Sequence, residues 1–141
     1  MSAALHLAVR LVHVLGMAAL VGGSAATWYA LRIDLPRSLR LATRFEWLFW
    51  ASLGLMVVTG VGNLGTLGPP APATRWGTVL TVKLVVVLAV GLGSAVRSLA
   101  VGRLRGRGAD AATRASLRRL YAATAWSLVL LVALAEVLAH G

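Results

Sequence analysis

Three of the four long apolar stretches in this sequence each contain a single charged residue: Arg10, Lys83 and Glu136. The fourth stretch carries none. An ionisable side chain within the hydrocarbon of a bilayer is energetically costly and commonly marks a functional site. If the stretches cross a membrane in alternating directions, all three charges fall in the same half of the bilayer. This arrangement predicts a polar pocket that opens to one side of the membrane.

The histidines of the chain lie in the same half. A stripe of side chains with the spacing i, i+4, i+7 and i+11 marks one helix face of the first stretch: His6, Arg10, His13 and Met17. Glu136 and His140 lie four residues apart and share a face of the last stretch. With a rise of about 1.5 Å per residue, His6 and His140 lie near the surface and His13 lies roughly 15 Å inside. These residues predict a polar column that reaches about mid-membrane.

Copper is one candidate for this column, because imidazole nitrogen and thioether sulfur both suit it. The predicted ligands are His6, His13, Met17 and His140, with Glu136 as a charge partner. Arg10 and Lys83 count against a metal, because two cations would repel it and Glu136 offsets only one of them.

Haem b is a second candidate, since helical bundles hold haem between inward-facing histidines. His13 would be one axial ligand, and His140 or Met56 the other. Arg10 and Lys83 would contact the propionates. The two cations that count against copper therefore count in favour of haem. No second histidine sits at the depth of His13, which counts against haem.

Two further interpretations need no cofactor. In the first, Glu136 pairs with Arg10 or Lys83, and the histidines bond to backbone or water. In the second, His13, Lys83 and Glu136 relay protons, for which their residue types are suited.

The elements that must position these residues follow from composition. The chain has 141 residues, of which 59% are hydrophobic and 13% are charged, whereas about a quarter of a soluble domain is charged. A membrane span needs about 20 mostly apolar residues, and we expect spans at about 3–31, 46–66, 76–97 and 119–140. The prediction is an all-α, integral membrane four-helix bundle formed by a single transmembrane domain over residues 1–141.

Basic residues are concentrated in two of the three expected loops. The first loop contains Arg32, Arg37, Arg40 and Arg44, and the third contains or adjoins Arg97, Arg103, Arg105, Arg107, Arg114, Arg118 and Arg119. Because basic residues collect on the cytoplasmic side, we expect both termini and the 64–75 loop on the outer, periplasmic side of the cell membrane. The net charge of +10 is thereby explained without nucleic acid. The absence of cysteine excludes disulfides and thiolate metal sites.

Two segments resemble a known family. Thr59-Gly60-Val61-Gly62-Asn63, followed by the run from Arg75-Trp76-Gly77 to Lys83-Leu84, is similar to the copper resistance protein D (CopD) domain. His13 with Gly22-Gly23 resembles the first helix of the same superfamily, which includes the HemJ-type protoporphyrinogen oxidase. In the HemJ type, a first-helix histidine and a third-helix lysine form the pair associated with haem or porphyrin, and His13 and Lys83 match those positions. Leu35-Pro36-Arg37 resembles the HemJ first-loop motif, but the Tyr-His that follows it there is absent, which puts that enzymatic activity in doubt.

The resemblance implies a membrane protein that binds copper in an outward-facing pocket, for copper handling or transport. The first alternative is a small membrane haem b protein for electron transfer or haem handling. The second is a cofactor-free assembly factor of a respiratory complex. Enzymatic activity is not expected unless haem is bound, in which case the protein would be a membrane oxidoreductase. The expected partners are membrane lipid, copper or haem, and a second copy of the chain or a respiratory complex.

Overall fold

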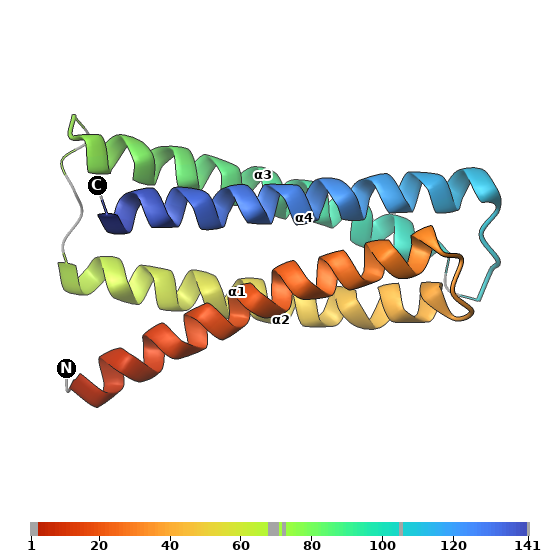
Figure 1. The fold of residues 1–141 in the computed structure, drawn as a ribbon, viewed down its shortest axis with the longest axis horizontal. Helices are drawn as coiled ribbons and strands as arrows, with labels where there is room; N and C mark the ends of the chain where they lie inside the picture. Colours follow the sequence, from red (N-terminus) through yellow and green to blue (C-terminus); the bar gives the residue numbers. More distant parts are fainter. Residues whose placement is uncertain (1–2, 68–70, 72, 105, 141) are drawn as a thin grey trace.

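The computed structural model describes residues 3–67, 71, 73–104 and 106–140. Four long helices follow one another: α1 (Ala3–Arg32), α2 (Ser38–Leu67), α3 (Arg75–Arg103) and α4 (Ala111–His140). They run alternately up and down, so that both termini lie at the same end of the molecule (Figure 1). The expectation of an all-α chain with four apolar helices is confirmed.

Each helix contains a segment long and apolar enough to cross a membrane: Ala4–Arg32, Ser38–Gly62, Arg75–Arg103 and Ala111–Val137. Three helices extend further than expected from apolar runs alone, since α2 begins at Ser38, α3 ends at Arg103 and α4 begins at Ala111. Charged residues interrupt an apolar run without breaking a helix, because arginine is a good helix former. The apolar runs therefore marked the middle of each helix and not the turns at its ends.

Local signals define the helix starts. The Thr74 side chain caps α3 by accepting a hydrogen bond from the backbone N–H of Gly77 at 3.1 Å. The Asp110 carboxylate likewise accepts a bond from the N–H of Thr113 at 2.8 Å, at the start of α4. Hydrogen bonds from Thr113 hold the pKa of Asp110 below its usual value. The first loop contains two non-glycine residues with positive φ, Asp34 (49°) and Arg37 (71°).

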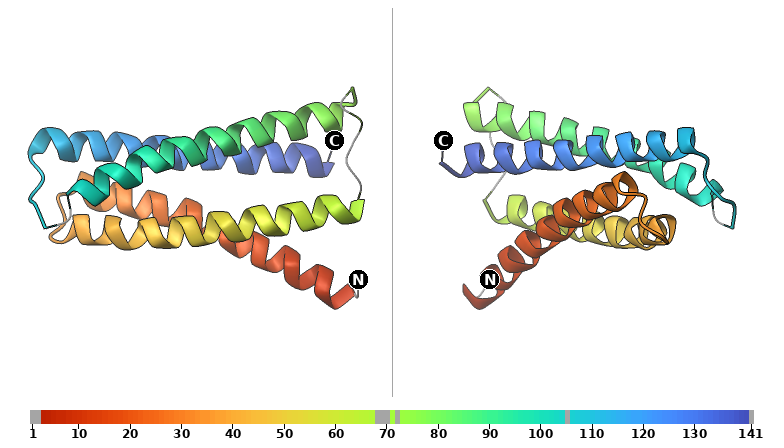
Figure 2. Two further views of the ribbon diagram at one scale, coloured as in Figure 1. Left: turned by 180° about the vertical axis from the view of Figure 1, so that it is seen from behind. Right: turned by 45° about the vertical axis from the view of Figure 1, so that its right-hand side comes forward.

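The two ends of the bundle differ in packing. We call the end with both chain termini the termini end, and the opposite end, with the first and third loops, the arginine end. The helices lie close together at the arginine end, whereas α1 and α2 diverge from α3 and α4 toward the termini end (Figures 1 and 2). Most of the buried apolar core lies in the arginine half, including Leu31, Ala42, Phe45, Val101, Leu117 and Tyr121.

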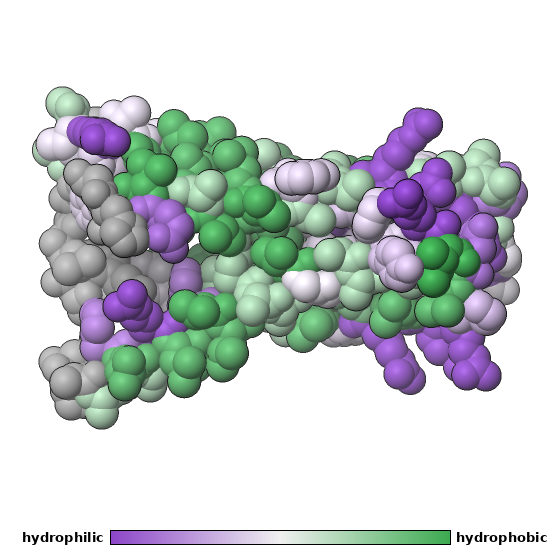
Figure 3. Space-filling model, viewed as in Figure 1, coloured by the Kyte–Doolittle hydropathy of each residue, from purple (hydrophilic) through white to green (hydrophobic). Residues whose placement is uncertain are grey.

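The surface matches a membrane environment. Large apolar side chains are exposed along the helices, among them Leu7, Val58 and Leu88, each more than 60% accessible. Figure 3 shows hydrophobic surface along the middle of the molecule and hydrophilic side chains gathered at the arginine end. Hydrophilic surface also appears at the termini end, between the diverging helices. The chain is therefore a multi-pass membrane protein.

Candidate functional site

His13 is held against α2 in the half of the bundle where the helices diverge. Its ring nitrogen Nδ1 lies 2.8 Å from the hydroxyl oxygen of Thr59. Thr59 is buried and His13 is half-buried. The backbone of Gly60 lies beside the same ring, because a Cβ added at Gly60 would be 3.9 Å from the His13 Cε1 atom. A side chain of α1 is thus fixed by two consecutive residues of α2.

Three hydrogen-bonding groups surround the Thr59 hydroxyl. Its oxygen lies 2.8 Å from the backbone carbonyl of Leu55, 3.2 Å from that of Met56 and 2.8 Å from His13 Nδ1. When the hydroxyl donates its one proton to the Leu55 carbonyl, it accepts from His13, and Nδ1 is the protonated nitrogen. Nε2 then carries a lone pair, and none of the described residues makes a hydrogen bond to it. An imidazole oriented through Nδ1–H with a free Nε2 is the arrangement found in histidine metal ligands.

A thioether lies one helical turn further along the same seam between α1 and α2. The Met56 Sδ atom packs against Gly16, where an added Cβ would be 3.2 Å from the sulfur. Because Gly16 follows His13 by three residues and Met56 precedes Thr59 by three, the two contacts stack along one line. Met17 is half-buried and packs against the core. The seam therefore presents soft sulfur donors beneath an oriented imidazole.

Lys83 of α3 is half-buried, and its positive charge is felt at His13. The pairing of the first-helix histidine with the third-helix lysine, which the resemblance implies, stays a prediction. A cation at this position disfavours a permanently bound metal ion and favours an anionic group.

The other predicted site residues are less enclosed. His6, Arg10 and Glu136 are exposed, so two of the three charges expected to be buried, Arg10 and Glu136, are not enclosed by the helices. The His140 side chain lies outside the described part of the structure. Within the described part, no group of three or more histidine, aspartate or glutamate side chains is placed to hold a metal ion.

A buried ion pair that sequence reasoning missed lies in the arginine half. Arg97 is fully buried, and its Nε atom donates to Glu46 Oε1 at 2.8 Å while a terminal nitrogen donates to Oε2 at 3.1 Å. The other terminal nitrogen of Arg97 donates to the Thr124 hydroxyl at 2.6 Å. A two-pronged contact of this kind is the strongest form of arginine–carboxylate pairing.

The Glu46 carboxylate receives further bonds, from the hydroxyls of Ser98 and of Tyr121, the latter at 2.5 Å. The Arg97 guanidinium also lies over three aromatic rings: Phe49 at 4.4 Å, Tyr121 at 4.8 Å and Phe45 at 5.7 Å. The network joins α2, α3 and α4, so it acts as a structural clamp whose charges are all satisfied.

The sequence held one signal for this clamp. Only four residues of the chain are acidic, and Glu46 adjoins an apolar run, so it needs a partner if it enters the membrane. Arg97 stands at the end of an apolar run, so the sequence places it among the basic residues of the third loop that indicate the membrane topology.

A family model described as Copper resistance protein D matches residues 39–138. The matched range includes Thr59, Lys83 and the clamp, whereas His13 precedes it. The resemblance seen in the sequence is confirmed over this range. No curated protein and no solved structure shows significant similarity to the chain.

Proposed function

Because the chain belongs to the copper resistance protein D family, we propose that it handles copper at the membrane through the diverging half of the bundle. The observation that carries this proposal is the hydrogen bond from His13 Nδ1 to Thr59, which leaves Nε2 as a donor atom. Histidines that bind metal are commonly oriented in this way, by a hydrogen bond at the ring nitrogen that does not touch the metal.

Copper would be a cargo that passes through this half. Cu⁺ accepts imidazole and thioether ligands, and His13 with Met17 or Met56 supplies both kinds. His6, His140 and Glu136 would meet the ion nearer the termini end. The Lys83 ammonium weakens binding at His13, which suits an ion that must leave again, because transport requires binding that is not too tight.

Replacement of His13 tests the proposal most directly. His13→Ala should abolish stoichiometric Cu⁺ binding by the purified protein in detergent, measured by competition with a chromophoric chelator. Thr59→Val removes the orienting acceptor and should weaken binding about 10–100-fold, as loss of such support does in other metal sites.

Thr81→Val is the matched control, since the Thr81 hydroxyl also bonds to a backbone carbonyl four residues earlier, that of Gly77. It should leave Cu⁺ affinity unchanged. Full Cu⁺ binding by the His13 variant, or equal losses in the two threonine variants, would remove His13 and Thr59 from the site.

The orientation belongs to the same proposal: the termini end faces outward, because the arginines lie at the other end. The chain has no cysteine, so single cysteines give clean labels. Ala71→Cys should react with an impermeant maleimide added to intact cells, and Gly108→Cys should react only after the cells are opened. Gly108 has open space for a side chain. The reverse labelling pattern would invert the topology.

Haem b is the second candidate, supported by one observation, the half-buried Lys83 whose positive charge is felt at His13. His13 Nε2 would be the axial ligand and Lys83 the partner of a propionate. An absorption spectrum of the purified protein before and after dithionite separates the candidates. A Soret band that shifts on reduction supports haem, and a colourless protein that binds Cu⁺ supports copper.

A further inference from the structure

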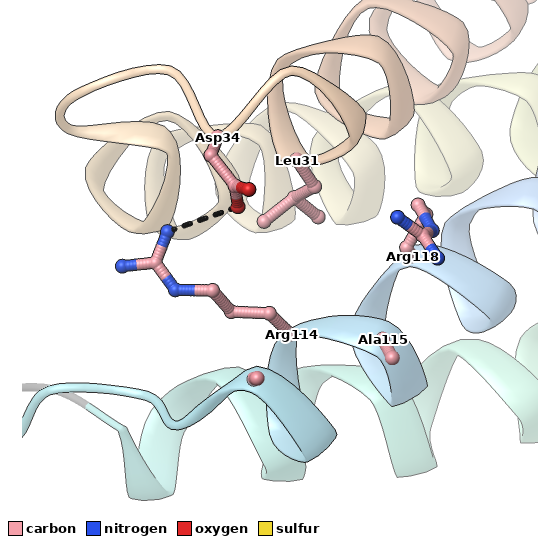
Figure 4. A pocket seen from close by; sticks show the side chains of 6 residues that line it. Leu31, Asp34, Arg114, Ala115 and Arg118 are labelled. Atoms are coloured by element: carbon pink, nitrogen blue, oxygen red, sulfur yellow. Dashed lines mark hydrogen bonds and ion pairs between the residues drawn. The ribbon is translucent and has the colours of Figure 1, made fainter.

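A cavity of about 440 Å³ lies at the arginine end, between the end of α1, the first loop and the first two turns of α4. It is lined by Leu31, Asp34, Ala111, Arg114, Ala115 and Arg118. Figure 4 shows the side chains of Asp34 and Arg114 on one side of Leu31 and that of Arg118 on the other. None of these residues belongs to the half that contains His13.

The cavity exists because small side chains alternate with long ones on α4. Ala111 and Ala115 are four residues apart and leave space, while Arg114 and Arg118 have the same spacing beside them. Leu31 is only 2% exposed and is held in the core. One wall is therefore held by the core, and the space is bordered by two guanidinium groups.

The charges of the cavity are unbalanced. Two arginines line it, and Asp34 is its only acid. The single ion pair is long, 3.5 Å from a terminal nitrogen of Arg114 to Asp34 Oδ1, and the Asp34 side chain is 74% exposed. Arg114 is also anchored by a bond from its Nε to the Ala109 carbonyl at 3.3 Å. Like charges four residues apart on a helix repel each other, so an anion between them would be stabilised.

The position of the cavity indicates which kind of anion would bind there. It lies where the membrane segment of α1 ends, at Arg32, and where that of α4 begins, at Ala111. A span that ends at these residues puts the cavity at the level of the lipid headgroups. We propose that Arg114 and Arg118 bind the phosphate of an anionic phospholipid, whose headgroup enters the cavity. The site is independent of the proposed copper function.

Native mass spectrometry of the detergent-solubilised protein tests this site. Phosphatidylglycerol should bind, and phosphatidylcholine should bind much more weakly. Arg114→Gln with Arg118→Gln should weaken phosphatidylglycerol binding by about tenfold or more, as expected for the loss of charge-assisted hydrogen bonds. Inorganic phosphate, titrated without lipid, should bind weakly because it lacks the acyl chains.

A charge-matched control removes two exposed arginines outside the cavity, Arg107→Gln with Arg119→Gln. It should keep phosphatidylglycerol affinity within about twofold, because exposed charges that do not line the cavity are screened by solvent and salt. Equal losses in both double variants, or equal binding of the two lipids, would overturn the site. Tight phosphate binding that depends on Arg114 and Arg118, without lipid binding, would retain the cavity and assign it to a soluble phosphate.

Discussion

Arg97→Met should lower the free energy of unfolding by about 3–5 kcal/mol, because it leaves the Glu46 carboxylate buried without its cation. Glu46 would keep only the hydroxyl donors of Ser98 and Tyr121. Three helices meet at this carboxylate, so the loss should be seen as a large decrease in Tm, measured by circular dichroism in detergent.

Arg103→Met is the matched control, since Arg103 is an exposed arginine in the last turn of the same helix. Its effect should remain within about 0.5 kcal/mol, as for other surface substitutions. Glu46→Leu combined with Arg97→Met should recover much of the stability, because an apolar pair needs no charge compensation. An Arg97 variant as stable as the Arg103 variant would show that the clamp contributes nothing to stability.

Gly23→Ala should destabilise the bundle by about 1–3 kcal/mol, the cost of overpacking a core. A Cβ at Gly23 would lie 2.3 Å from Cε2 and 2.7 Å from Cδ2 of Phe45, which is closer than atoms can approach. The Phe45 ring cannot easily yield, because it packs against Phe49 with 6.0 Å between ring centroids and against Tyr121 with 5.9 Å. Thermal unfolding in detergent measures the effect.

The neighbouring glycine gives the control. Gly22→Ala meets no atom within 4 Å and should be neutral or slightly stabilising, because alanine favours the helix. Phe45→Leu should restore part of the stability when combined with Gly23→Ala. Equal unfolding temperatures for the two alanine variants would contradict the close contact between α1 and α2.

The fold could be predicted from the sequence because the bilayer imposes length and composition on each span. Four apolar segments of sufficient length, separated by Pro36 and by glycine- and arginine-rich segments, specify four helices. The helix ends were harder to predict from the sequence. The α2 helix begins at Ser38 and α4 at Ala111, each about eight residues before the expected spans that start at 46 and 119. Hydropathy reports the most apolar part of a helix, whereas backbone hydrogen bonding decides where the helix begins.

The candidate site was predicted only in part. Residue type and depth singled out His13 and Lys83, and both side chains are half-buried in the structure. Spacing along a helix gives the face of a residue but not its partner on another helix, so the bond from His13 to Thr59 was not foreseen. For the same reason Glu46 and Arg97, 51 residues apart, were not paired.

The uneven packing of the bundle has a consequence for how such a chain can diversify. The clamp and the apolar core concentrate stability in the arginine half, whereas the diverging half holds few buried contacts. Substitutions around His13 therefore cost little folding free energy compared with those around Arg97. A gene encoding this fold can therefore vary the residues around His13 at one end while selection for stability acts on the other.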